Sequence, residues 1–517
     1  MRLARPAPLA LAVVAILLAT GCSAGSSGSA PAATPLSSPA AVGGPVLASP
    51  PATLAGYYAQ KLHWWPCGHG FQCARLLVPF DYQRPAWRRF SLPVIRLPAS
   101  DPARRIESLV VNPGGPGGSG VQYAQAARTF ISPGARARFD VVGFDPRGVG
   151  GSVPAVHCLT GPQMDTYLQT NDHPVTQAQL ATVVAQSKLF VQGCERRSGA
   201  LLPYVGTRNA ARDMDILRAA LGDAKLTYLG KSYGTYLGAW YAQEFPSHVR
   251  AMVLDGAVDP GQSALTGIVV QVKGFELALR SFTANCVRLA GCPLGHGTVT
   301  AGISRLQGLL NRTASMPLAS MIPGQQASAP LLLEGVVAAL YLKSYWQYLR
   351  AGLTEAFAGN GSLLVEMGDL EVERNSNGQY SNLIDAETAV DCLDRSWPRS
   401  LAVWRSAASV AQKAAPQFGT ADMWGSLPCA YWPVPAPAAV PLHAKGAPPI
   451  LVIGTTRDPA TPFQQAQALA RDMSSGVLLA WNGDGHTAYR MGSACIDSAV
   501  DRYLITLAAP RSGTLCQ

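Results

Sequence analysis

The clearest pattern along the chain is an alternation of short apolar runs with segments whose apolar residues recur at helical spacing. Apolar runs of strand length that end in glycine occupy residues 105–115, 137–148, 225–230 and 249–256. Residues 207–222 instead predict a helix that ends at Gly222, and residues 235–246 predict a second helix that ends at Pro246. Strands that alternate with helices in this way indicate a mostly parallel sheet covered by helices.

The pattern changes near residue 264. From 264 to 400 helical spacing dominates and strand-like runs are sparse. Strand character returns at 448–458 and 476–486, and a final helix is predicted over 495–509. We therefore expect an α/β fold in which a sheet domain of residues 56–263 is interrupted by a helical insertion, 264–400, and completed by residues 401–517.

The first residues predict export. Arg2 and Arg5 precede an apolar stretch, residues 9–18, that is too short to span a bilayer. The sequence "LLATGC" that follows resembles a bacterial lipobox, in which cleavage leaves a lipidated cysteine, here Cys22. Ala19 stands where leucine is usual, so a plain signal peptide is the alternative. In both cases residues 1–21 are removed and take no part in the fold.

A linker is predicted next, over residues 22–55. It is nearly all Ser, Ala, Pro and Gly between 23 and 51 and carries no charge there, so it cannot bury enough apolar surface to fold. With a lipid on Cys22, this tether would hold the protein on the outer face of the cytoplasmic membrane or in the cell envelope. With a plain signal peptide, the protein would be secreted.

The cysteine count agrees with export. The chain has 11 cysteines, and setting Cys22 aside leaves ten, an even number, as a disulfide framework in an oxidising compartment requires. No C-x-x-C and no H-E-x-x-H motif is present, which argues against a metal site. Proximity along the sequence suggests the pairs Cys67–Cys73, Cys158–Cys194, Cys286–Cys292, Cys392–Cys429 and Cys495–Cys516.

The charge of the protein changes this picture little. The formal net charge is +10, but Lys and Arg are scattered along the chain and form no basic run longer than two residues. This distribution indicates a generally basic surface, and we expect no nucleic-acid partner. The sequence does not indicate an oligomeric state.

One short motif indicates chemistry. "GKSYG" places Ser232 between two glycines, directly after a predicted strand and before a predicted helix, which is the sequence context of a nucleophile elbow. A serine nucleophile needs a base, and the base needs an orienting acid. Asp458 and His486 follow two later apolar runs, in the chain order serine, acid, histidine. We expect these three residues to form a catalytic triad, with Asp255 and Asp259 as rival acids.

An oxyanion hole requires two backbone N–H donors. One is expected at Tyr233, the residue after the nucleophile, and the other in the loop after an earlier strand. The glycine-rich stretch 110–120 is such a loop, and we predict the Gly115 amide as the donor, with Gly114 as the next candidate. A phosphate loop is excluded, because Lys225 stands where the first glycine of that motif is required before "GKS".

Taken together, these motifs resemble a known family. "NPGGPGGSG", "FDPRGVGGS", "YLGKSYGTYLG", "VLDGAVDP", "GTTRDPATP" and "GDGHTAY" are similar to segments of the secreted tripeptidyl aminopeptidases, relatives of the proline iminopeptidases. The resemblance covers about residues 57–516 and is weakest between about 264 and 391. It implies an α/β-hydrolase fold with a helical lid, the triad named above and no cofactor.

The resemblance also implies hydrolysis of peptides from a free N-terminus, with lid carboxylates that hold the substrate ammonium. Glu334, Asp391 and Asp394 are the candidates for that role. Two alternatives stay open: an esterase or lipase that uses the same triad, and a non-catalytic binding module that keeps the fold.

Overall fold

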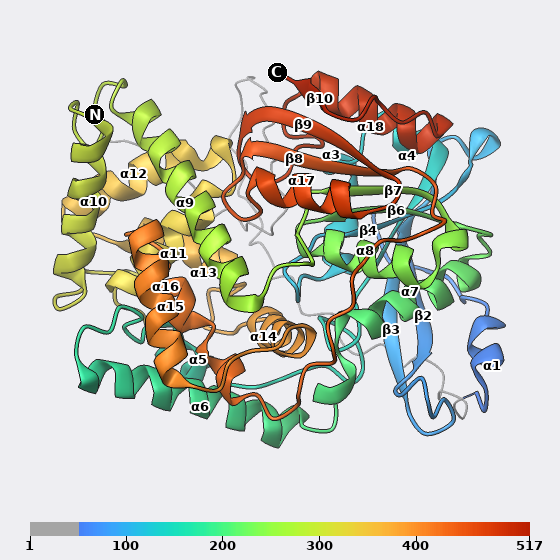
Figure 1. The fold of residues 1–517 in the computed structure, drawn as a ribbon, viewed down its shortest axis with the longest axis horizontal. Coiled ribbons are helices and arrows are strands. Elements are labelled where there is room, and N and C mark those ends of the chain that lie inside the picture. The colour runs from blue at the N-terminus through green and yellow to red at the C-terminus, as the bar shows by residue number, and fades with distance from the viewer. Residues whose placement is uncertain (1–50) are drawn as a thin grey trace, which may run out of the picture.

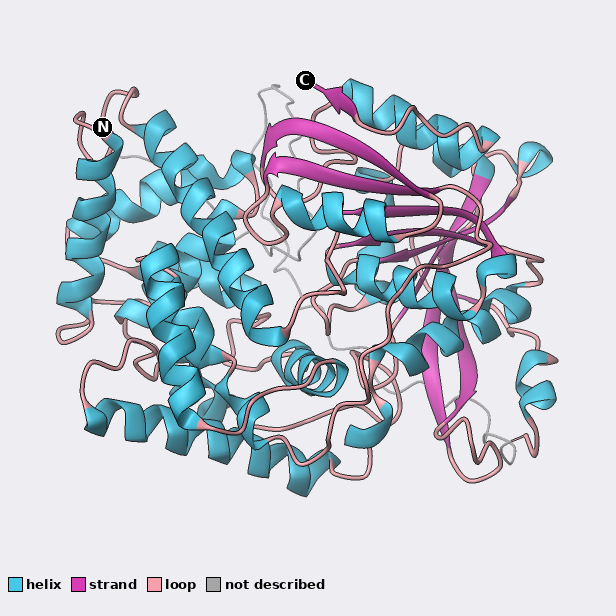
Figure 2. Ribbon diagram, viewed as in Figure 1, coloured by secondary structure: helices cyan, strands magenta, loops and turns pink. Residues whose placement is uncertain are grey.

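The computed structural model describes residues 51–517. Its centre is a ten-stranded sheet in the order β1-β2-β3-β5-β4-β6-β7-β8-β9-β10 (Figures 1 and 2). Pairing is antiparallel from β1 through β3 to β5 and parallel across the rest of the sheet. The strands are β1 (Trp65–Pro66), β2 (Gln72–Pro79), β3 (Arg89–Leu97), β4 (Glu107–Asn112), β5 (Phe139–Phe144), β6 (Leu226–Lys231), β7 (Val249–Asp255), β8 (Ile450–Arg457), β9 (Gly476–Asp484) and β10 (Thr514–Cys516).

Helices cover both faces of this sheet, as the alternating pattern predicts. One face packs against α7 (Thr207–Leu221), α8 (Tyr233–Glu244) and α17 (Phe463–Asp472). The other packs against α2 (Gly120–Gln125), α3 (Ala127–Phe130), α4 (Pro133–Arg138) and α18 (Ala494–Thr506). The central strands β5 and β6 are buried along their whole length, which explains why their sequences read as continuous apolar runs instead of alternating ones.

A third hydrophobic core belongs to the helical insertion, which lies to the left of the sheet in Figure 1. Its helices are α9 (Ala264–Cys286), α10 (Val299–Thr313), α11 (Ala329–Leu340), α12 (Trp346–Phe357), α13 (Ser362–Glu371) and α14 (Leu383–Asp394). Helices α15 (Leu401–Ala414) and α16 (Gly419–Gly425) contribute to the same core, so the helical part continues beyond residue 400, the boundary expected from the sequence. Strand pairing resumes only at β8.

Several elements precede this insertion or lie at the edges of the fold. Helix α6 (Gln177–Ser198) packs Leu180 and Val183 into the core of the insertion although it comes earlier in the chain. Helix α1 (Leu54–Tyr58) begins inside the predicted tether, and α5 (Gly161–Leu168) precedes α6. The short 3-10 helices are η1 (Pro102–Arg104), η2 (Leu202–Tyr204), η3 (Pro246–His248), η4 (Lys343–Tyr345) and η5 (Leu427–Tyr431).

Five disulfides join the ten cysteines of the described region in the pairs that sequence proximity suggests: Cys67–Cys73, Cys158–Cys194, Cys286–Cys292, Cys392–Cys429 and Cys495–Cys516. A framework of this size is typical of exported proteins. The predicted signal peptide and Cys22 lie outside the described residues. Within residues 51–517, no helix is both long and apolar enough to cross a membrane.

Candidate active site

Ser232 lies at the sharp turn from β6 into α8, as the motif predicts. Its backbone has φ 53° and ψ −127°, a strained conformation for a residue with a side chain. The flanking glycines are required by close approach: a Cβ on Gly230 would lie 2.3 Å from the carbonyl oxygen of Gly234, and one on Gly234 would lie 2.8 Å from Oδ1 of Asn112. The Ser232 N–H donates to the carbonyl oxygen of Asp255 at 3.0 Å, which fixes the turn on the neighbouring strand β7.

Asp458 and His486 are brought together by the ends of β8 and β9. Nδ1 of His486 lies 2.8 Å from Oδ1 and 3.0 Å from Oδ2 of Asp458. The carboxylate is 1% exposed and also accepts the N–H groups of Ala460 (3.0 Å), Thr461 (2.8 Å) and Thr487 (3.1 Å). Because these donors fix the carboxylate, the carboxylate in turn fixes the imidazole with Nδ1 as its bonded nitrogen.

The other ring nitrogen of His486 is left for a reacting group. Nε2 is buried and has no hydrogen-bond partner within residues 51–517. The ring packs edge-on against Tyr341 at 5.4 Å between centroids, and the His486 N–H donates to the carbonyl oxygen of Tyr341 at 2.7 Å. On its other side, Cε1 lies 3.1 Å from the position that a Cβ on Gly256 would occupy. The helical insertion therefore covers the imidazole directly.

The predicted oxyanion donors lie beside the nucleophile. A Cβ built on Gly114 would approach Cβ of Ser232 to 2.8 Å and the Tyr233 nitrogen to 3.1 Å, so the glycine loop passes directly over the elbow. The Gly114 N–H is already bonded to Oδ1 of Asn112 at 3.0 Å. The amides of Gly115 and Tyr233 have no recorded partner among the described residues, which favours Gly115 over Gly114 as the second donor.

The rival acids have other partners. Both carboxylate oxygens of Asp255 accept backbone N–H groups, those of Ala488 (2.8 Å) and Tyr489 (3.0 Å). Asp259 accepts the N–H of Gly261, two residues further on, at 2.8 Å. Since neither has a recorded hydrogen bond to His486 in residues 51–517, the geometry favours Asp458 as the orienting acid.

Helices α11, α13, α14 and α16 bring acidic side chains together near His486. We call Glu334, Glu371, Glu387, Asp391 and Asp422 the acidic cluster. Burial raises the pKa of Glu334 to about 8 and those of Glu371, Asp391 and Asp422 to about 7, and it raises the pKa of Glu387 well above its ordinary value. Neighbouring carboxylates add to most of these increases. Each side chain keeps part of its surface accessible. Arg395 is near enough to lower the pKa of Asp391, but it forms no direct ion pair with any of the five among residues 51–517.

The third predicted lid carboxylate, Asp394, already has hydrogen-bond partners within the protein. Its oxygens accept the N–H of Thr207 at 2.8 Å and a short hydrogen bond from the Thr207 hydroxyl, which also contacts the hydroxyl of Tyr233. Burial raises the pKa of Asp394 to about 6. Asp394 therefore links the start of α7 to the residue after the nucleophile, and less of its hydrogen-bonding capacity is open to a substrate.

Helix α14, which carries Glu387, Asp391 and Asp394, is held firmly on the sheet domain. The buried side chain of Asn382 donates to the carbonyl oxygens of Gly148 (2.8 Å) and Val156 (3.0 Å) and accepts the N–H of Gly150 (2.8 Å). The first turn of the helix touches the glycine loop, since a Cβ on Gly117 would lie 2.5 Å from the carbonyl oxygen of Leu383. This helix is thus a fixed wall of the site.

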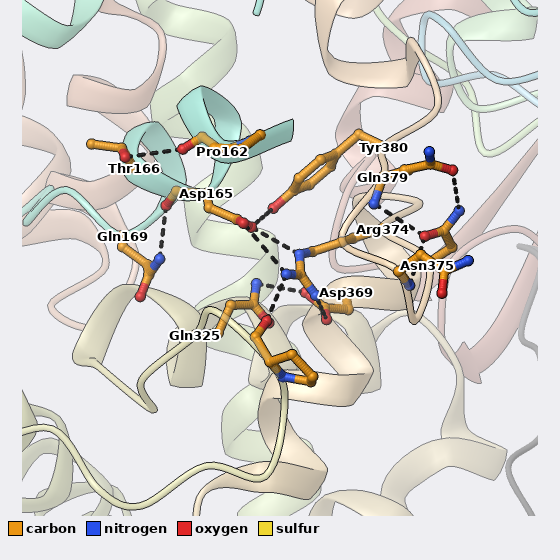
Figure 3. A network of polar contacts seen from close by, with 12 residues as sticks. Pro162, Asp165, Thr166, Gln169, Gln325, Asp369, Arg374, Asn375, Gln379 and Tyr380 are labelled. Carbon is orange, nitrogen blue, oxygen red and sulfur yellow. Dashed lines mark hydrogen bonds and ion pairs between the residues drawn. The ribbon is translucent and has the colours of Figure 1, made fainter. Parts of the chain in front are cut away.

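A network of polar contacts secures the segment that leads into α14 (Figure 3). Arg374 is 2% exposed at its side chain and donates to Asp165 at 2.8 Å and to Asp369 at 3.2 Å. Tyr380 donates to the same Asp165 at 2.7 Å, and Gln325 donates to Asp369 at 2.8 Å. The network joins α5, α13 and the loop before α14, so this part of the insertion is tied to a helix that precedes it in the chain.

Comparison with known proteins assigns this chain to a family. A profile described as "TAP-like protein" matches residues 415–516. The serine protease Hip1 of Mycobacterium tuberculosis is 38% identical over 479 residues, which cover 88% of this chain and 91% of Hip1. The chain belongs to the TAP-like family. Its fold is accordingly the α/β-hydrolase fold, and the protein is a serine hydrolase.

Two further relatives of this TAP-like protein carry different names. The tripeptidyl aminopeptidase of Streptomyces coelicolor is 32% identical over 455 residues, which cover 86% of this chain and 82% of the relative. A Mycobacterium tuberculosis protein named carboxylesterase B is 39% identical over 453 residues, covering 86% of each chain. Both the peptidase and the esterase hypotheses therefore have named relatives.

Several residues of the candidate site were not predicted from the sequence. Glu371 and Asp422 carry no local signal, because they come from separate helices that meet only in the folded insertion. Glu387 precedes Asp391 by four residues on the same helix, a spacing that places both on one face and was readable in the sequence. Thr461 was also missed: its hydroxyl lies 3.2 Å from Oδ2 of Asp458 and 3.4 Å from Nδ1 of His486.

Proposed function

We propose that this TAP-like protein is an exported serine aminopeptidase, which cleaves short peptides from a free N-terminus through an acyl-enzyme. Oγ of Ser232 attacks the scissile carbonyl carbon, and Nε2 of His486 accepts its proton. Asp458 holds the imidazole in position and stabilises the imidazolium. The amides of Tyr233 and Gly115 bind the oxyanion, and each such donor typically contributes about 3–4 kcal/mol to transition-state stabilisation.

Breakdown of the tetrahedral intermediate uses the same groups in reverse roles. His486 delivers its proton to the leaving amine, so that the C–N bond breaks and the acyl group stays on Ser232. Water then attacks the ester, again with His486 as base, and releases the shortened acid. No step requires a metal or an organic cofactor.

The acidic cluster is the observation that carries the exopeptidase proposal. A hydrolase that recognises only an ester or an internal peptide bond gains nothing from several half-buried carboxylates that raise one another's pKa values. A substrate ammonium placed among them would stabilise their ionised forms and bind through charge-assisted hydrogen bonds. Within the cluster, Glu371 is close enough to His486 for the imidazole to lower the pKa of its carboxyl group.

The test compares a tripeptide–fluorophore substrate that has a free N-terminus with its N-acetylated twin. We expect cleavage of the free form alone, and no cleavage by Ser232→Ala. Glu371→Gln and Glu387→Gln should raise KM for the free form by about tenfold or more, the equivalent of one charge-assisted hydrogen bond. Glu355→Gln is the matched control, because Glu355 is exposed on α12 of the same insertion.

A second candidate function is ester hydrolysis, favoured by the relative named carboxylesterase B. Two results would replace the aminopeptidase proposal with this one. The first is equal cleavage of the free and acetylated peptides. The second is cleavage of neither peptide together with rapid turnover of a p-nitrophenyl ester. An intact protein that neither turns over a substrate nor reacts with a fluorophosphonate would support a binding module instead.

We also propose that a lipid on Cys22 anchors the mature protein outside the cytoplasmic membrane. The lipobox-like sequence and the uncharged tether support this arrangement, which places the five disulfides in an oxidising compartment. Metabolic labelling with a clickable fatty acid should mark the wild-type protein and leave Cys22→Ser unmarked. Label retained in that variant would exclude Cys22 as the site.

A further inference from the structure

The residue directly before the nucleophile is a buried lysine whose role the proposed mechanism does not explain. Lys231 ends β6, is 6% exposed, and is preceded by Gly230 in the tripeptide "GKS". Its Nζ lies 3.7 Å from Oδ2 of Asp255, which ends the neighbouring strand β7 and is 0% exposed. A buried ion pair pays a desolvation free energy that an ion pair on the surface avoids. The burial of Lys231 and Asp255 therefore needs a structural role that explains it.

The contacts of the pair converge on the loop that follows His486. Lys231 donates to the carbonyl oxygen of Tyr489 at 3.1 Å and to the hydroxyl of Thr487 at 3.2 Å. Asp255 accepts the N–H groups of Ala488 and Tyr489. Three consecutive residues after the proposed base are thus held by the two strand ends that flank the nucleophile.

The loop needs such support because its backbone is strained. Thr487 has φ 67°, an unfavourable value for a β-branched residue. The conformation persists only where the surroundings fix it. Meanwhile the main-chain carbonyl of Asp255 accepts the N–H of Ser232, so one residue contacts both the elbow and the loop.

We propose that the Lys231–Asp255 ion pair is a positioning device that holds the His486 loop in register with Ser232. Neither side chain touches the substrate. The pair acts through residues 487–489, which set the height and tilt of the imidazole above the nucleophile. The inference rests on the proposed triad, in which Ser232 and His486 react together.

The test separates stability from reactivity by measuring the rate at which a fluorophosphonate probe labels Ser232 in the full mature chain. Lys231→Met leaves Asp255 buried without its cation and should lower the melting temperature markedly. The double variant Lys231→Met/Asp255→Asn removes both charges at nearly constant shape, but it also turns one of the two acceptors of the loop N–H groups into a donor. It should therefore recover part of the lost melting temperature and still label about 10- to 100-fold more slowly than wild type, the cost of misplacing a reacting group by about 1 Å.

The matched control is another buried pair, Arg218–Asp215 on α7, whose atoms lie 2.7 Å apart away from the site. Arg218→Met/Asp215→Asn should label at the wild-type rate once the folded fraction is taken into account. Equal slowing in this control, or a wild-type labelling rate in the Lys231/Asp255 double variant, would overturn the proposal.

One further variant covers the case in which the double variant does not fold. Thr487→Val removes a single contact of Lys231 and keeps the pair, and it should label a few-fold more slowly; an unchanged rate would count against the positioning role. A wild-type protein that is folded but never labelled would instead refute the proposed nucleophile, so the two failures are distinguishable.

Discussion

Replacing Glu334 by glutamine should stabilise the substrate-free protein at neutral and alkaline pH while it weakens substrate binding. Burial and the neighbouring carboxylates raise the pKa of Glu334 from an ordinary value of 4.5 to about 8. Between these values the folded protein holds a proton that the unfolded chain releases. Stability that is fully present below pH 4.5 is therefore lost as the pH rises through 8.

The size of the effect follows from the same two values. A difference of about 3.5 pH units, at about 1.36 kcal/mol per unit, corresponds to about 5 kcal/mol when the loss is complete. From pH 5 to pH 8 the loss amounts to about 3.5 kcal/mol. Because the side chain keeps part of its surface open to water, screening reduces this, and we expect about 1–2 kcal/mol.

Urea denaturation at pH 5, 6, 7 and 8 measures this loss. Glu334→Gln should flatten the fall of the unfolding free energy between pH 5 and pH 8 by about 1–2 kcal/mol. The exposed Glu355→Gln variant should keep the wild-type slope. If the unfolding free energy of Glu334→Gln fell with pH as steeply as that of wild type, Glu334 would titrate normally. That result would argue against a preformed cation site in the cluster.

Four other predictions follow from the geometry. Thr461→Val removes a hydroxyl that bonds Asp458 and faces His486, and it should lower kcat about tenfold with little change in KM, since one hydrogen bond to a charged group contributes about 1.5–3 kcal/mol. Gly230→Ala forces a methyl group to within 2.3 Å of the Gly234 carbonyl oxygen and should abolish fluorophosphonate labelling; a labelled variant would contradict the elbow geometry. Full reduction should lower the melting temperature, because each disulfide typically contributes about 2–4 kcal/mol, and an unchanged value with demonstrated free thiols would argue against the five bridges. KM for a free-amine tripeptide should fall between pH 6 and pH 7.5 as the acidic cluster ionises, whereas a flat profile would separate binding from the cluster.

The residues proposed as nucleophile, acid and base could be selected from the sequence because each follows a strand within a few residues. Parallel strands bring their carboxyl ends to one edge of the sheet, so a residue just after each strand is placed near the others by topology alone. Ser232, Asp458 and His486 all satisfy this condition. Local spacing was equally sufficient for the disulfides, whose partners are 6 to 37 residues apart in the sequence.

The acidic cluster could not be located in this way. Three of its members come from α11, α13 and α16, which pack in a separate hydrophobic core, and two come from α14, which packs on the sheet domain. Helical periodicity shows which face of a helix is buried, but it does not show which other helix that face meets. Two of the three predicted lid carboxylates, Glu334 and Asp391, lie in the cluster, whereas Asp394 binds Thr207.

This division between sheet and insertion bears on substrate choice. In the proposed mechanism the sheet edge supplies the reacting groups, and those groups serve amides and esters alike. Relatives named as a tripeptidyl aminopeptidase and as a carboxylesterase are both more than 30% identical to this chain, so overall identity does not separate the two activities. We propose that the distinguishing feature lies where the insertion meets the proposed triad. There Tyr341 covers His486, and Glu371 contributes a carboxylate to the electrostatic environment of the imidazole. Burying several carboxylates together destabilises the substrate-free protein. A cationic substrate that binds among them would offset this loss of stability, whereas a neutral ester would not. For this physical reason we expect a peptide N-terminus in preference to a neutral ester.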